Sequence, residues 1–162
     1  MNRQSMLKAL RAARSSQLQW MAFTRSLADN PASSDRFSKS AVEAQKRFEE
    51  WYYMAAQRFS GLGAFELVTA NHKALVELQD QILEALSRPV PPQSDRFLSW
   101  FRDPRRHDEK LQNLVTKAQR RSQRLLDGLE ILEKELRALP DETVRKIASE
   151  RYVDNVRSFL IN

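Results

Sequence analysis

Histidine offers the most direct route to metal or acid–base chemistry in this sequence, which contains two, His72 and His107. A metal site or a catalytic pair needs a second ligand or acid at matching helical spacing. His72 has no such partner one turn away, and His107 lies within a run of charged residues. We interpret both as structural or surface histidines. A metal-binding sensor that combines His72 with Glu66 or Glu43 is kept as an alternative.

Other motifs that carry chemistry are missing. The sequence has no cysteine, which excludes disulfides, thiolate zinc sites and cysteine nucleophiles, and which fits a cytoplasmic location. The pair Gly61 and Gly63 is not followed by lysine or serine at the spacing of a phosphate-binding loop. Neither Gly-x-Ser-x-Gly nor His-Glu-x-x-His occurs. We therefore expect no enzymatic activity and no cofactor.

A basic segment, residues 102–124, is the main candidate for binding anions, with eight basic residues against three acidic ones. We expect its side chains to point several ways around a helix, whereas tracking a phosphate backbone needs one face. Aromatic residues, which stack on single-stranded bases, are not interleaved with the basic ones. A partner-facing solvated surface is favoured, and nucleic-acid or anionic-surface binding is the alternative. The candidate residues are Arg105, Arg106, Lys117, Arg120, Arg121 and Arg124.

Aromatic residues are concentrated in two clusters. Trp51, Tyr52 and Tyr53 are adjacent, and we expect one ring to be buried and two to be half-exposed with hydrated hydroxyls. A second cluster at residues 97–101 is expected to close one end of the fold. These clusters predict packing between helices and not a ligand pocket.

The elements that must position these residues are helices. Apolar residues recur at helical spacing, and no strand pattern or internal repeat is present. Ser40 and Glu43 predict a capping box at the start of the second helix. Residues 29–40 are expected to be a loop, residues 88–94 a stiff proline-rich connector, and Pro104 a break after a short helical piece. The expected helices are residues 4–28, 40–60, 64–87, 105–138 and 142–160.

The fold class predicted from these lengths is all-α. Short connections between long helices favour an antiparallel up-down four-helix bundle, residues 1–139, with an additional C-terminal helix, residues 140–162. No apolar run is long enough to span a membrane. The net charge of +6 favours acidic partners in a general way.

Two of the expected helices have polar residues on their apolar stripes. Gln17 and Thr24 lie on the stripe of the first helix, and Arg121 interrupts the stripe of the fourth. The aliphatic stem of an arginine can still cover apolar surface. The fourth-helix stripe is Leu111, Leu114, Ala118, Leu125, Leu129, Leu132 and Leu136.

A family resemblance rests on the tryptophan spacings. Gln17-Leu-Gln-Trp20, the run Lys-Arg-Phe-Glu-Glu-Trp-Tyr-Tyr at residues 46–53, and His72 resemble the chemoreceptor zinc-binding domain of bacteria, over about residues 14–86. That family is a four-helix bundle with the patterns His-x-x-Trp, Cys-x-x-Gly-x-Trp-Tyr and His-x-x-x-His. The resemblance implies the bundle fold and a regulatory role.

The metal-ligand positions that the resemblance implies have changed. Gln17 and Lys46 stand where the family has histidine and cysteine, and Val76 stands where it has the second histidine after His72. One histidine cannot hold zinc, which needs at least three protein ligands. We therefore interpret the chain as a non-enzymatic regulatory module that has lost its metal site. It is expected to act through contacts with another protein, including a second copy, with the basic fourth helix and the final helix, including Phe159 and Leu160, as candidate surfaces.

Overall fold

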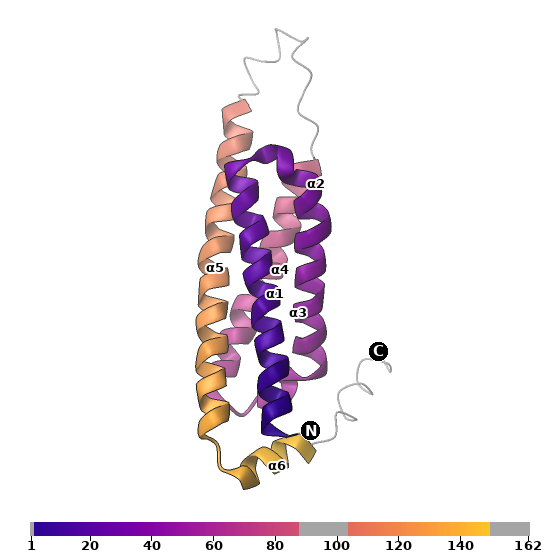
Figure 1. Cartoon of the computed structure of the whole chain (residues 1–162). Helices are drawn as coiled ribbons and strands as arrows, with labels where there is room; N and C mark the ends of the chain where they lie inside the picture. The colour runs from indigo at the N-terminus through magenta and orange to yellow at the C-terminus, as the bar shows by residue number, and fades with distance from the viewer. Residues whose placement is uncertain (1, 88–103, 150–162) are drawn as a thin grey trace, which may run out of the picture.

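The computed structural model describes residues 2–87 and 104–149, and within these ranges it is helical without any strand. Four long helices lie side by side along one axis, and a short sixth helix crosses one end (Figure 1). No helix in the described ranges carries an apolar stretch long enough to cross a membrane. The principal helices are α1 (Arg3–Asp29), α3 (Val42–Met54), α4 (Gly63–Ser87), α5 (Pro104–Ala138) and α6 (Asp141–Ser149).

The all-α prediction is confirmed, and the bounds of α1, α4 and α5 match the expected ranges within one residue. The second expected helix is shorter, because α3 ends at Met54 and a 3-10 turn, η3 (Ala56–Phe59), follows it. The expected connector, the second aromatic cluster and the end of the final helix lie outside the described residues.

The prediction of a loop at residues 29–40 is wrong. The segment is a 3-10 turn η1 (Pro31–Ser33), a short helix α2 (Ser34–Arg36) and a π-helical turn η2 (Phe37–Ala41). Its turn-forming composition is overridden by packing, because Phe37 and Ala41 are buried against the rest of the core. Ser40 therefore lies inside a helical segment, and α3 has no side-chain cap.

The ends of the other helices follow from local chemistry. At the start of α1 the Asn2 carboxamide accepts a hydrogen bond from the Ser5 backbone N–H at 2.8 Å, and the Ser5 hydroxyl oxygen accepts one from the Asn2 N–H at 3.0 Å. This reciprocal capping box satisfies two donors that the first turn would leave open. Pro104 follows residues that lie outside the described ranges, so the predicted break before it stays a prediction. Pro104 is the first residue of α5, where a proline needs no N–H partner.

The core runs the length of the four long helices. The fourth-helix stripe predicted from the sequence is buried throughout, but Ser122, not Arg121, occupies its inward position. The largest fully buried side chains of the whole core are Trp20, Phe37, Phe48, Phe59, Met6, Leu10, Leu27, Leu75, Ile82, Leu125, Leu129 and Leu132.

The helices approach one another to different degrees. α4 and α5 meet closely at Gly128, where an added Cβ would lie 3.2 Å from Val68 Cγ2 and 3.4 Å from Leu67 Cγ. Between α3 and α4 the space is filled by rings, with Tyr52 stacked on Phe65 at 6.0 Å between centroids. A glycine thus lets α4 and α5 approach closely, whereas aromatic rings fill the space between α3 and α4.

Candidate functional site

A buried chain of polar side chains links three helices at the middle of the core. Gln17 of α1 donates from Nε2 to Gln45 Oε1 at 3.0 Å, and Gln45 of α3 donates from Nε2 to His72 Nδ1 on α4 at 3.3 Å. All three side chains are buried, with 3% of His72 exposed. We call these residues the polar chain.

The direction of these hydrogen bonds determines the tautomer and the charge of His72. Because Gln45 Nε2 donates to Nδ1, the imidazole carries its proton on Nε2 and is neutral. Burial lowers the pKa of His72 from 6.5 to about 4, since the charged form loses its hydration. Rings of Phe48, Tyr52 and Tyr53 surround the imidazole, the nearest at 4.6 Å between centroids. His72 is therefore a neutral core residue near pH 7.

A second buried contact lies beside the polar chain. Trp20 Nε1 donates to Gln79 Oε1 at 2.7 Å, which joins α1 to α4 directly. Two polar-chain atoms, Gln17 Oε1 and His72 Nε2, have no hydrogen-bond partner within the described ranges. The polar chain can thus position rings and helices, but its atoms do not form a proton relay to a substrate.

The sequence singled out two positions of this site, Gln17 and His72, and did not point to Gln45 and Gln79. Gln17 and His72 are joined through Gln45, whereas Lys46 is exposed and contributes nothing to the core. Lys46 faces outward because one residue along a helix is a rotation of about 100°. The signal for Gln45 was its position three residues before the buried Phe48. Gln79 had a comparable signal, its place on the apolar stripe of α4.

The alternative metal site is not assembled. Glu43 and Glu66 are exposed, and Val76 is only partly buried. No group of three or more histidine, cysteine, aspartate or glutamate residues gathers as a metal site in the described part of the chain. Two neutral carboxamides and one imidazole are a weak donor set for zinc, which prefers thiolate, imidazole and carboxylate ligands.

The expectation for the aromatic triplet is partly wrong. Trp51 and Tyr52 are both buried, with 8% and 7% exposed, and Tyr53 alone is open, at 53%. Tyr52 is buried because its hydroxyl finds a partner in Thr69 Oγ1 at 2.9 Å across α3 and α4. Trp51 and Tyr52 thus belong to the hydrophobic core.

The rim of this ring cluster is acidic. Partial burial, and then the charge of Asp80, raise the pKa of the Glu49 carboxyl above its ordinary value. Burial, followed by the charges of Glu49 and Tyr52, raises the pKa of Tyr53. Both shifts favour the protonated form, and no group of three or more metal-ligating side chains gathers here in the described ranges.

The outer surface of α5 carries a second candidate. Lys117, Arg120, Arg121 and Arg124 are all exposed and follow the spacing i, i+3, i+4, i+7, which covers about 100° of the helix circumference. These four therefore share one face of α5, whereas Arg105 and Arg106, which the same expectation included, have side chains outside the described residues. Lys110, seven residues before Lys117, extends the same line. We call these five residues the cation face.

None of the cation-face residues forms an ion pair within residues 2–87 and 104–149. Other cations of the chain do. Arg11 and Arg137 both bind Glu133 Oε1, at 2.9 and 2.8 Å. Burial opposes ionisation of Glu133, but the hydrogen bond and charge of Arg11 and the charges of Arg137 and Arg14 hold its pKa below the ordinary value.

Neutral side chains hold α5 in place beside the cation face. Gln112 Nε2 donates to the Ala28 carbonyl oxygen at 2.9 Å, and Gln119 Nε2 donates to the Met21 carbonyl oxygen at 3.0 Å. The later residue of α5 bonds to the earlier residue of α1, so these two helices are antiparallel. The rotation of α5 is fixed by its glutamines and leucines, and this fixes the direction of the cation face.

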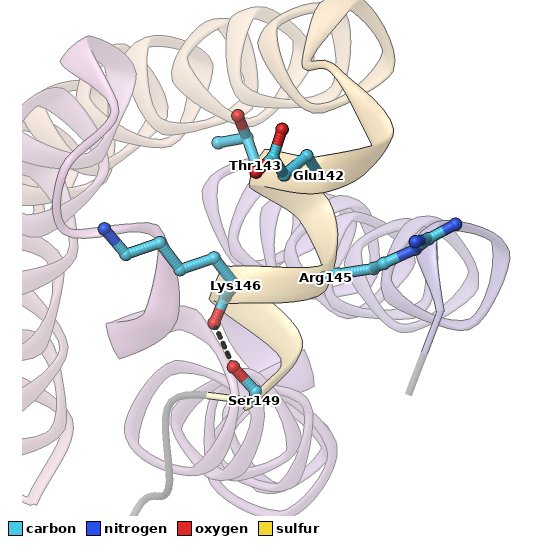
Figure 2. A pocket seen from close by; sticks show the side chains of 5 residues that line it. All are labelled: Glu142, Thr143, Arg145, Lys146 and Ser149. Carbon is cyan, nitrogen blue, oxygen red and sulfur yellow. Dashed lines mark hydrogen bonds between the residues drawn. The ribbon is translucent and has the colours of Figure 1, made fainter.

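Other predicted surface residues are not placed. α5 contains Arg105 and Arg106, but their side chains lie outside the described residues, as do Phe159 and Leu160. α6 has a shallow hollow lined by Glu142, Thr143, Arg145, Lys146 and Ser149. Figure 2 shows Arg145 and Lys146 pointing to opposite sides of this helix. Its lining groups do not converge on a common point.

Comparisons with known proteins gave no relatives on which to base a function. No family model matches the chain, and no curated protein or solved structure matches it. The function is therefore argued from the polar chain, the cation face and the apolar surface residues.

Proposed function

We propose that this protein is a non-enzymatic regulatory module that acts through protein–protein contacts. In this proposal α1, α3, α4 and α5 form an antiparallel up-down four-helix bundle, and α6 begins an additional C-terminal helix. The architecture is that of the chemoreceptor zinc-binding bundle, with the metal site replaced by the polar chain. The proposal is supported mainly by the hydrogen bonds that join Gln17, Gln45 and His72.

Those bonds occupy part of the ligand set that a metal would need, and they leave Gln17 Oε1 and His72 Nε2 without a partner in the described ranges. His72 Nδ1 is engaged by Gln45, and the Gln45 oxygen is engaged by Gln17. Carboxamides bind zinc poorly, and a site with a single imidazole falls short of three protein ligands. A buried polar chain of this kind can instead fix which helix faces meet, because a mismatched arrangement would leave buried groups unpaired.

The contact surface in this proposal lies on the seam of α4 and α5. Leu67 is 39% exposed and Ile131 is 44% exposed, and they flank the close approach at Gly128. The surface beside Ile131 carries both signs of charge, and Lys134 Nζ lies 3.1 Å from Glu130 Oε1. A rim with both signs can pair with a copy of itself across a two-fold axis, which is an isologous contact. The partner we assign is therefore a second copy of the chain.

Sedimentation velocity over a concentration series tests this assignment. The wild type is expected to associate reversibly, and Leu67→Gln with Ile131→Gln is expected to weaken association at least tenfold. Leu18→Gln with Met54→Gln is the matched control, because these side chains are also exposed but lie elsewhere. A wild type that stays monomeric throughout the series, or equal weakening by both pairs, contradicts the second copy as partner.

Elemental analysis of protein purified without a histidine tag tests the missing metal site. The expected result is less than a tenth of an equivalent of any transition metal, and no change in melting temperature when zinc is added. A stoichiometric metal that is lost in His72→Gln would overturn the proposal, because it would place a working site on the polar chain.

A further inference from the structure

We propose that the cation face of α5 binds the backbone of double-stranded nucleic acid through its phosphates, without reading sequence. This goes beyond the proposed function, because it concerns a different surface and a different partner. The attraction is electrostatic, whereas the contact at the seam of α4 and α5 is apolar. The cation face consists of Lys110, Lys117, Arg120, Arg121 and Arg124.

The cation face has the length and shape that a phosphate backbone needs. Fourteen residues separate Lys110 from Arg124, which is about 21 Å along a helix rising 1.5 Å per residue. A straight line of cations of this length spans several phosphates of one groove edge. Three of the five are arginines, whose planar guanidinium groups bind phosphate oxygens in pairs.

The charge on this surface is uncompensated. Residues 110–126 contain no acidic residue, and the cation face makes no ion pair within the described ranges. Arg120 and Arg121 are held one and two residues from Gln119, which anchors α5 to α1. Leaving five neighbouring cations unpaired costs folding energy through like-charge repulsion. A polyanion that releases counterions on binding would offset that cost.

A neighbouring helix adds to the field. Arg25 of α1 is exposed and lies between Met21 and Ala28, the two residues whose carbonyl oxygens accept bonds from α5. After Asp108 and Glu109 at its beginning, α5 has no further acidic residue until Asp127. The field is thus positive over residues 110–126 and acidic residues outnumber basic ones from Asp127 onward, which would hold a rod-like anion on the positive stretch.

The chemistry of the surrounding residues selects among anionic partners. Single-stranded nucleic acid needs aromatic rings for stacking, and residues 109–126 expose none. A membrane surface is bound by helices that insert an apolar face, whereas the apolar face of α5 is buried in the core. An acidic protein would need apolar anchors between the cations, but the exposed neighbours here are Asn113, Thr116 and Gln123. A duplex requires none of these features.

Fluorescence anisotropy with a labelled 20-base-pair duplex, at 50, 100 and 200 mM salt, tests the proposal. Four to five phosphate contacts predict a slope of log affinity against log salt of about −4, and a loss of roughly 100- to 1000-fold across this range. Lys117→Gln, Arg120→Gln, Arg121→Gln and Arg124→Gln combined should reduce the slope to about −1 and weaken binding at 50 mM at least 30-fold. Glutamine is a good helix former, so circular dichroism should be unchanged.

A matched control removes the same number of charges elsewhere. Lys8, Lys39, Lys46 and Lys73 are exposed and lie off the cation face, and their change to glutamine should weaken duplex binding less than threefold. Equal losses in both variants, or no binding of the wild type at 50 mM salt, would overturn the proposal. Polyglutamate, or vesicles with anionic lipid, bound as tightly as the duplex and through the same four residues, would also overturn it.

Discussion

The polar chain in the core and the cation face on the surface differ in whether their polar groups are paired with one another. Inside, Gln17, Gln45 and His72 bond to one another across three helices. Outside, the cation-face residues of α5 form no ion pair in the described ranges. The difference follows from solvent. An unpaired polar group costs several kcal/mol when buried, whereas water solvates an exposed charge at little cost.

The comparison separates residues that should affect stability from residues that should affect binding. Residues of the polar chain are coupled through direct bonds, so a change there should act on folding. Residues of the cation face are exposed and form no ion pair in the described ranges, so a change there should act on partners. Four predictions test that separation, ordered from the largest expected effect on stability to the smallest.

Gln45→Ala should have the largest effect. The change leaves Gln17 Nε2 and His72 Nδ1 without their partner and opens a cavity beside Phe48. We expect a loss of about 3 kcal/mol in the free energy of unfolding, measured by urea denaturation. Lys46→Ala is the control, and it should change stability by less than about 0.5 kcal/mol because its side chain is exposed. If the two variants are equally stable, the polar chain does not hold the helices.

Acid should weaken the fold through His72. Its pKa in the folded state is about 4, below the ordinary 6.5, so the unfolded chain binds the proton more readily. This contribution is fully present above pH 6.5 and is lost as the pH falls toward 4, by about 3 kcal/mol in total. The measurement is urea denaturation from pH 7 to 4 for wild type and His72→Gln. The carboxylates titrate in both, so the difference isolates His72, and parallel curves would contradict the prediction.

Glu133→Gln should have an intermediate effect. It removes the carboxylate that Arg11 of α1 and Arg137 of α5 share. Because both arginine side chains are more than half exposed, at 53% and 55%, solvent screens the interaction and the expected loss is about 1 kcal/mol. Thermal unfolding at low and high salt would measure it. The gap between wild type and variant should narrow in high salt, and a constant gap would mean that packing, not charge, is responsible.

Arg121→Glu should have the smallest effect on folding and the opposite sign. The new carboxylate would face Lys117 four residues before it and Arg124 three residues after it, replacing repulsion by attraction. We expect a gain of a few tenths of a kcal/mol in the free energy of unfolding. Urea denaturation of the wild type and the variant measures it. A loss above about 1 kcal/mol would show that Arg121 carries a packing role and that the cation face is not a free surface.

Much of this architecture could be predicted from the sequence, because apolar residues recur along long helices at a regular spacing. The stripe of α5 was read correctly from Leu111 to Leu136. Prediction failed where packing competes with local preference, at residues 29–40, whose turn residues form short helical segments over the buried Phe37. The candidate site was half predicted. Gln17 and His72 were singled out, but their connection through Gln45 was not.

Lys46 and the cation face show what the sequence leaves open. The spacing of Lys117, Arg120, Arg121 and Arg124 places them on one face of a continuous helix, but whether a face turns inward or outward depends on how the helix is rotated against its neighbours. On α3 the π-helical turn η2 and the buried Phe48 fix this rotation, and they turn Gln45 inward. On α5 the glutamines that reach the carbonyls of α1 fix it, and they turn the arginines outward.

The amino-acid order alone determined that this chain is helical and where its longest helices begin and end, because helical periodicity, prolines and caps act over a few neighbouring residues. The tertiary structure alone decided which polar groups meet inside, and that the helix face with Lys117, Arg120, Arg121 and Arg124 points outward. These depend on how each helix is rotated against the others, and rotation is set by contacts between residues far apart in the chain.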